Sequence, residues 1–179
     1  MATILARLSG RTTQTDLPVQ AAAVCYRRVS SSVEFLLVNT SSGKWTFPKG
    51  RINPGMSAGA SAAQEAWEEA GAMGNVAEQQ FDFYLDTKRA LGHDAFSREI
   101  RIAAFLFEVH STVTPLESGR NPNWFSARAA KKLLAEGRTS QYAKQITRIV
   151  DSAMDHLRTR QTRTRSVLLP SRRRLATAR

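Results

Sequence analysis

Three glutamates, Glu65, Glu68 and Glu69, stand at spacings i, i+3 and i+4 within an alanine-rich segment. In a helix these spacings place all three carboxylates on one face, where like charges repel one another and weaken the helix. A divalent cation converts that repulsion into coordination, because carboxylate oxygens are the ligands that Mg²⁺ and Mn²⁺ prefer. A solvated acidic face is the alternative, and the spacing alone does not choose between the two.

The residues around the glutamates predict a rigid support for them. Residues 45–50 (WTFPKG) form a short apolar strand that ends in a Pro/Gly loop, and the turn signal Asn-Pro-Gly follows at 53–55. Ser57 or Ser61 can then cap a helix that runs through the glutamates, with Gly71 just past its end. The segment therefore reads as strand, loop, helix and loop.

This segment resembles the signature of the Nudix hydrolase family. The signature runs Gly, five residues, Glu, seven residues, Arg-Glu, an aliphatic residue, any residue, Glu-Glu, any residue, Gly and an aliphatic residue. Residues 50–72 match its spacing without a gap, with Gly50, Glu65, Glu68, Glu69 and Gly71 in the expected places. The signature's first Glu is replaced by Met56 and its Arg by Gln64.

The resemblance implies an α/β fold, an α/β/α sandwich with a mixed β-sheet. The chain offers suitable elements on both sides of the box, because apolar runs bounded by turn signals predict strands and a 3.6-residue apolar period predicts helices. The predicted strands are residues 20–28, 33–39, 81–86, 100–109 and 121–125, and the predicted helices are 126–134, with Ser126 as cap, and 139–157.

The family hydrolyses pyrophosphate bonds, usually in a nucleoside diphosphate linked to another group, so the resemblance implies a metal-dependent pyrophosphohydrolase that uses Mg²⁺ or Mn²⁺. It implies metal binding by Gly50, Glu65, Glu68 and Glu69, catalytic roles for the three glutamates and Gln64, and substrate binding by Lys49, Gly50 and Arg51. The general base stays open: Glu65 or Glu69 can serve, and so can an acid outside the box, with Asp94, Glu99 and Glu117 as candidates.

The two altered positions bear on the rate of the reaction. Gln64 can donate a hydrogen bond to a glutamate, but without the charge and the two-pronged geometry of arginine, and Met56 carries no charge at all. The three glutamates are retained, so we expect slower chemistry rather than none. The alternative is a catalytically weakened Nudix module that binds a nucleotide, RNA or a protein partner.

The substrate is less closely indicated. The WTFPKG approach to the box and the late Asn-Trp-Phe segment are similar to family members that act on diadenosine polyphosphates and diphosphoinositol polyphosphates. Such anionic small molecules suit the basic residues Lys88, Arg89, Arg98 and Arg101, although these can equally be solvated surface residues.

The net charge of +11 is concentrated at one end of the chain. Residues 158–179 hold eight arginines and no acid, which leaves +3 for the rest. We expect a flexible leader at 1–18, one Nudix domain at 19–157, and an Arg-rich tail at 158–179 that is disordered or continues the last helix. The tail offers RNA, acidic lipids or a protein partner an electrostatic contact with strong salt dependence, and we do not expect specific nucleic-acid recognition, because no aromatic residues interleave the arginines.

Several other classes of protein are disfavoured. The single cysteine, Cys25, excludes an intrachain disulfide framework and is expected in the core, and the three histidines show no metal-ligand spacing. No apolar stretch is long enough to span a bilayer. We therefore expect a cytoplasmic enzyme with a small-molecule phosphoanhydride substrate; the sequence does not indicate its oligomeric state.

Overall fold

The computed structural model describes residues 19–89 and 97–168. The predicted leader and residues 169–179 lie outside the described residues. The strands are β1 (Val19–Val29), β2 (Ser32–Asn39), β3 (Trp45–Thr46), β4 (Lys49–Arg51), β5 (Ala72–Val76), β6 (Asp82–Arg89), β7 (Ser97–Thr112) and β8 (Asn123–Ser126). The helices are α1 (Ala58–Ala70), α2 (Ala127–Ala135) and α3 (Ser140–Leu168).

The strands form one mixed sheet around a central parallel pair. β1 and β7 run parallel, with Val19 opposite Arg101 and Tyr26 opposite Glu108. The other pairings are antiparallel: β1 with β2 and β4, β2 with β3 and β8, and β7 with β5 and β6. β1 and β7 are therefore paired along both edges, which agrees with the continuous apolar run at residues 21–26.

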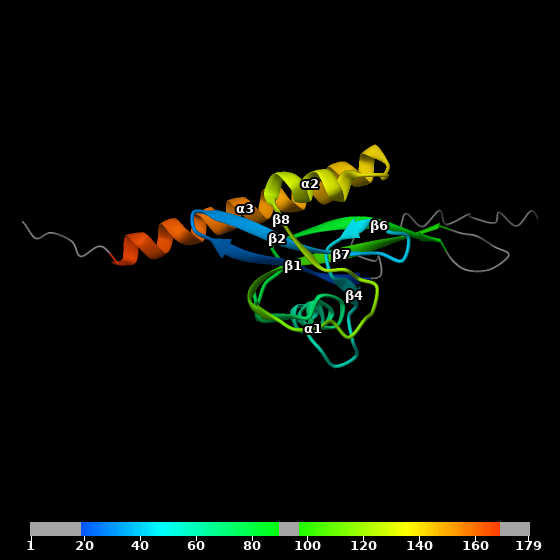
Figure 1. The fold of residues 1–179 in the computed structure, drawn as a ribbon, viewed down its shortest axis with the longest axis horizontal. Helices are drawn as coiled ribbons and strands as arrows, with labels where there is room; N and C mark the ends of the chain where they lie inside the picture. Colours follow the sequence, from blue (N-terminus) through cyan, green and yellow to red (C-terminus); the bar gives the residue numbers. More distant parts are fainter. Residues whose placement is uncertain (1–18, 90–96, 169–179) are drawn as a thin grey trace, which may run out of the picture.

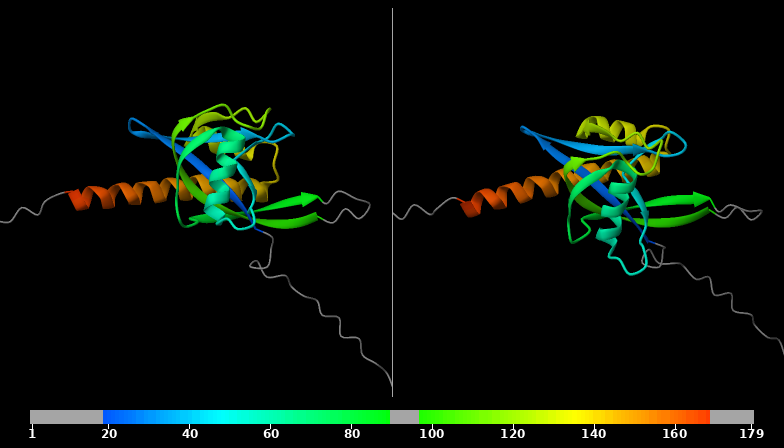
Figure 2. Two further views of the ribbon diagram at one scale, coloured as in Figure 1. Left: turned by 90° about the horizontal axis from the view of Figure 1, so that it is seen from below. Right: turned by 60° about the horizontal axis from the view of Figure 1, so that its bottom comes forward.

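Helices cover both faces of the sheet. α1 lies on one face, and α2 and α3 lie on the other, as Figures 1 and 2 show. The core on the α2/α3 side contains bulky side chains such as Phe35, Tyr84 and Ile146. The core on the α1 side takes only alanines from the described helix: Ala62, Ala66 and Ala70 are buried, and Ala58 and Ala63 pack against them. Such small side chains let α1 lie close to the sheet, and this brings its glutamates to the level of the strands.

The ends of α1 are defined as the sequence predicts. The hydroxyl of Ser57 accepts a hydrogen bond from the Ala60 N–H and caps the first turn. Gly71 adopts a left-handed conformation at φ 62° and ends the helix. A Cβ at Gly71 would lie 1.9 Å from the Val113 carbonyl oxygen, so glycine is needed here both for its φ and for the space.

The predicted α/β/α sandwich is confirmed, and each predicted strand and helix corresponds to an observed one. Two strands beside the box were missed. β4 falls within a segment that we expected to be a loop. Its three residues alone do not predict a strand, because their pairing with β1 depends on tertiary contact. β5 lacks alternation, and its Gly74 accommodates the Glu108 carbonyl where the register shifts.

The last helix extends well past Leu157, the last buried side chain that the structure describes in it. Residues 158–168 therefore correspond to the helical alternative for the start of the Arg-rich tail. Within the described ranges, no helix combines the length and the apolar character needed to cross a membrane.

Candidate active site

Glu65 lies against the backbone of β4. Gly50 on this strand pairs with Ala21 of β1, which fixes the strand beside the start of the sheet. A Cβ added to Gly50 would come within 1.7 Å of Glu65 Oε1, a distance that no real contact allows. Glycine at this position therefore leaves the space that the Glu65 carboxylate occupies.

Glu69 is the most buried acidic side chain that the structure describes, at 3% exposure. Its Oε2 accepts a hydrogen bond of 3.1 Å from the backbone N–H of Lys49, and its Oε1 lies 2.6 Å from Nη2 of Arg120. Burial raises the pKa of Glu69 to about 7. The Arg120 charge and the Lys49 N–H lower it, while the charge of Glu65 raises it.

The pKa of Glu65 is also raised, first by burial and then by the charges of Glu68 and Glu117. Nearby negative charges thus disfavour the ionised form of Glu65, and a cation beside it would offset this effect. The chemistry of this donor set, carboxylate oxygens beside the Gly50 backbone, fits a hard divalent ion. As placed, however, no three His, Cys, Asp or Glu side chains within residues 19–89 and 97–168 are grouped so as to hold a metal together.

Gln64 and Glu68 belong to a separate hydrogen-bonded chain. The Gln64 side-chain amide donates to Glu68 Oε1 at 2.7 Å and accepts from Asn53 Nδ2 at 2.9 Å. The Asn53 N–H in turn donates to Ser61 Oγ. Gln64, in the place of the signature's arginine, thus holds a box glutamate through one neutral hydrogen bond. Asn53 in the preceding turn fixes the orientation of the amide.

The remaining box residues lie in different environments. Lys49 Nζ is 3.7 Å from Asp86 Oδ2 on β6, so the lysine side chain is directed towards the neighbouring strand. Arg51 is exposed on β4, and Met56 is 38% exposed in the turn before α1. Of the acids considered as external bases, Glu117 lies near the box, Glu99 is exposed on β7, and Asp94 lies outside the described residues.

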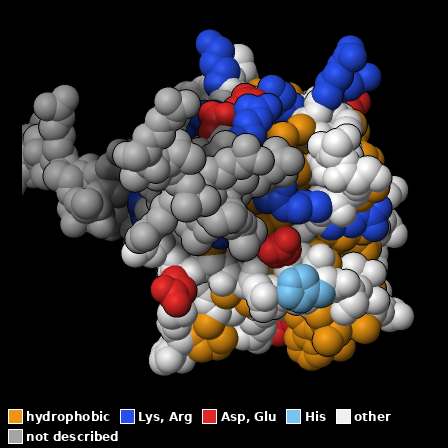
Figure 3. Space-filling model, turned by 90° about the vertical axis from the view of Figure 1, so that its left-hand side faces the viewer, with side chains coloured by type: hydrophobic (Ala, Val, Ile, Leu, Met, Phe, Trp, Pro, Cys, Tyr) orange, Lys and Arg blue, Asp and Glu red, His pale blue; other side chains and the backbone are white. Residues whose placement is uncertain are grey.

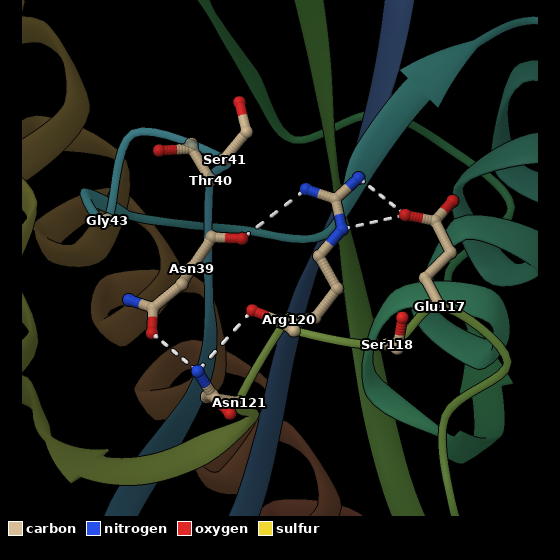
Figure 4. Close-up of a pocket in the computed structure, with 9 residues that line it drawn as sticks. Asn39, Thr40, Ser41, Gly43, Glu117, Ser118, Arg120 and Asn121 are labelled. Carbon is tan, nitrogen blue, oxygen red and sulfur yellow. Dashed lines mark hydrogen bonds and ion pairs between the residues drawn. The ribbon is translucent and has the colours of Figure 1, made fainter.

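Arg120 is the functional candidate that the sequence did not reveal. It lies in the loop between β7 and β8, and this loop is attached to α1 by two backbone hydrogen bonds, from Val113 N to Gly71 O and from Glu117 N to Glu68 O. The same loop lines a polar pocket of about 570 Å³ together with residues 39–43 (Figure 4). No spacing rule relates Arg120 to the box, so only the folded structure shows it beside Glu69.

A second feature missed from the sequence is a set of buried polar atoms without hydrogen-bond partners among the described residues. They include the hydroxyls of Thr46, Tyr84 and Tyr142 and Nε of Arg138. The Tyr84 and Tyr142 rings meet edge to face at 6.1 Å, and the Arg138 guanidinium lies over the Tyr142 ring. Buried polar atoms without a partner of this kind are uncommon in folded proteins.

Comparison with known proteins places these features in a family. The NUDIX domain model matches residues 17–146, which is most of the chain. The chain belongs to the Nudix family. Its class is therefore that of the Nudix pyrophosphohydrolases, which generally use divalent metals.

The individual relatives have low sequence identity to this chain. The Caenorhabditis elegans asymmetrical bis(5'-nucleosyl)-tetraphosphatase is 28% identical over 106 residues, which are 58% of this chain and 74% of that protein. The crystal structure of a C. elegans Ap4A hydrolase is 20% identical, with a TM-score of 0.56 over 79% of this chain and 98% of that one. The Nudix domain of Shewanella oneidensis NrtR, solved with ADP ribose, is 12% identical, with a TM-score of 0.58 over 79% and 88%. The likenesses to solved structures bear on the fold alone.

Two other sequence expectations concern residues outside the Nudix site. Cys25 is buried, and burial raises the pKa of its thiol far above the ordinary value, so it is a core residue rather than a nucleophile. His156 packs against the Phe81 ring at the outer face of α3, and His110 is exposed on β7.

Proposed function

We propose that this protein hydrolyses a pyrophosphate bond in a dinucleoside polyphosphate, with Mg²⁺ or Mn²⁺ as cofactor. Diphosphoinositol polyphosphates are the second substrate class. The observation that carries the proposal is the buried Glu69 together with the half-buried Glu65, both beside β4, in a Nudix domain whose relative with 28% identity is a bis(5'-nucleosyl)-tetraphosphatase. The resemblance of the WTFPKG segment to diadenosine and diphosphoinositol polyphosphate hydrolases supports the same choice.

In this proposal Glu65, Glu68 and Glu69 hold the cation, with the Gly50 backbone beside them. When bound, the cation neutralises phosphate charge and lowers the pKa of a coordinated water. Glu69 is held in place by the Lys49 N–H, and Glu68 is oriented by Gln64. Glu65 or Glu69 would accept the proton of the attacking water, or Glu117 would do so from outside the box.

The substrate's phosphates would meet Lys49 and Arg51 at the β4 edge. Lys49 Nζ lies 3.7 Å from Asp86 Oδ2 on β6, so this lysine is held beside the neighbouring strand at the place where we expect the phosphates to bind.

The test is a substrate panel with Mg²⁺ or Mn²⁺, containing diadenosine polyphosphates, diphosphoinositol phosphates, nucleotide sugars, nucleoside triphosphates and 5′-triphosphate RNA. We expect the highest kcat/KM on dinucleoside polyphosphates. Glu69→Gln should lower it by about 10²-fold or more, because it removes a charged ligand and a proton acceptor. The exposed Glu78→Gln serves as control. Equal turnover by the wild type and the Glu69 variant would contradict the assignment.

A weakened or non-catalytic binding module is the second candidate, and a specific observation favours it: Arg120 already neutralises Glu69. The double variant Met56→Glu, Gln64→Arg separates the two candidates, because it restores both charged positions of the signature. A severalfold rise in turnover would identify the native protein as a slow enzyme. No hydrolysis in either form, with nucleotide binding retained, would identify a binding module.

A further inference from the structure

The guanidinium of Arg120 uses all three nitrogens and bridges two acids. Its Nη2 lies 2.6 Å from Glu69 Oε1 and 2.6 Å from Glu117 Oε2, and Nε donates to the same Glu117 oxygen at 2.7 Å. Nη1 donates to the Asn39 carbonyl at 3.3 Å. Figure 4 shows the side chain between Glu117 on one side and Asn39 on the other, at the wall of the polar pocket.

The two acids differ sharply in their need for this cation. The Glu69 side chain is 4% exposed, so its negative charge depends on a nearby countercharge. The Glu117 side chain is 44% exposed, and water can solvate it when Arg120 moves. Arg120 therefore supplies to the buried carboxylate the compensation that a metal ion supplies in a loaded Nudix site.

A divalent cation that coordinates Glu69 competes with the guanidinium for Oε1, because the other oxygen, Oε2, already accepts the Lys49 N–H and the two positive charges repel one another. We therefore expect a cation at Oε1 to displace Arg120 from that oxygen. The contacts with Glu117 and Asn39 allow this, because they tether the side chain to its own loop and to the end of β2. The adjoining pocket of about 570 Å³ gives the guanidinium room to turn.

We infer that Arg120 is an exchangeable counter-ion of the site, which pairs with Glu69 in the metal-free protein, yields that carboxylate to the divalent cation, and then binds a phosphate group of the substrate from the side of the polar pocket. Arginine suits this role because its charge persists at any working pH and its planar fork matches phosphate oxygens. The inference rests on the proposed function for its substrate step only.

The first test needs no substrate. Mg²⁺ binding is measured by isothermal titration calorimetry at pH 8.5, where Glu69 is ionised, in the wild type, Arg120→Ala and Arg120→Lys. We expect affinity about tenfold higher in the alanine variant, because the competing charge-assisted contact is gone, and an intermediate value in the lysine variant. Equal or weaker binding in Arg120→Ala, or no Mg²⁺ binding in any form, would overturn the inference.

Arg148→Ala is the matched control. Arg148 also pairs with a carboxylate, Asp82, and also donates to a backbone carbonyl, that of Phe83, but it lies on α3. Its loss should leave Mg²⁺ affinity within twofold of the wild type. Thermal unfolding of each variant verifies that it is folded, and Arg120→Lys keeps the test open if the alanine variant is not.

The second test concerns the substrate. At saturating Mg²⁺ we expect Arg120→Ala to raise KM for the best substrate about tenfold, with kcat within threefold of the wild type. An unchanged KM would reject the phosphate contact. If the wild type hydrolyses nothing while Arg120→Ala still binds Mg²⁺ more tightly, the proposed function fails and the counter-ion exchange stands.

Discussion

At the scale of single residues, the unusual property of this protein is the buried carboxyl group of Glu69, whose pKa stays raised even with an arginine beside it. The Arg120 charge and the Lys49 N–H both favour the ionised form of Glu69, yet burial still raises its pKa to about 7. The free energy of folding therefore depends on the protonation of this one group.

This dependence has a definite sign. The pKa of Glu69 is raised from 4.5 to about 7 on folding, so between these pH values the folded state binds more protons than the unfolded one. The contribution of Glu69 to the free energy of unfolding is therefore largest below pH 4.5, and it falls as the pH rises to 7. We expect a loss of up to about 3 kcal/mol between pH 5 and 8 in EDTA, which Glu69→Gln abolishes.

Denaturant unfolding of both proteins at several pH values measures this effect. The difference between the two curves isolates Glu69, because every other titrating group is common to both. Parallel curves from pH 5 to 8 would show that the carboxyl group is not perturbed.

At the scale of elements, the site is a junction between the end of α1 and the loop that follows β7. The backbone hydrogen bonds from Val113 to Gly71 and from Glu117 to Glu68 join the two. Arg120 reaches Glu69 across this junction. The position of Gly71 therefore affects both the end of the helix and the placement of Arg120.

Replacing either of two glycines by alanine distinguishes the cost of a positive φ from the cost of a steric clash. Gly71 and Gly55 both have positive φ, at 62° and 80°, but a Cβ meets the Val113 carbonyl at Gly71 and nothing within 4 Å at Gly55. We expect Gly55→Ala to cost about 1 kcal/mol and Gly71→Ala at least about 2 kcal/mol more, measured by thermal unfolding. Equal costs would mean that the loop adjusts freely to the added methyl group.

The sequence predicted those parts of the site whose structure is determined by residues close to one another in the chain. The box, its cap at Ser57 and its end at Gly71 follow from spacing and backbone preference within a single segment. Arg120 and Asp86 could not be found in this way, since they reach the box through β-sheet pairing and loop docking. The pairing of Gly50 with Ala21 was missed for the same reason.

At the scale of the whole molecule, positive charge gathers where α3 leaves the fold. Figure 3 views this end and shows Lys and Arg side chains in the upper half of the face. Arg28, Arg128 and Arg158 line a groove of about 470 Å³ between the β1–β2 hairpin, α2 and α3. Beyond it the chain adds six more arginines at residues 163–179.

Truncation after Arg160 tests whether the positive charge of the following residues can be removed without loss of stability of the fold. The last buried side chain described in α3 is Leu157, so we expect the melting temperature to change by less than about 3 °C. Retention on heparin should fall to a markedly lower salt concentration, because six positive charges are lost. Unchanged retention would place the polyanion contact on the folded domain instead.

The parallel pairing of β1 with β7 has a consequence for how the protein is made. Each residue of β1 faces a partner 82 residues later in the chain, from Val19 with Arg101 to Tyr26 with Glu108. At about 5–20 residues per second, a ribosome needs roughly 4–16 s to deliver that partner. During this interval an apolar strand that ends up fully covered has one open edge, so a nascent chain stalled before β7 should be a substrate for chaperones.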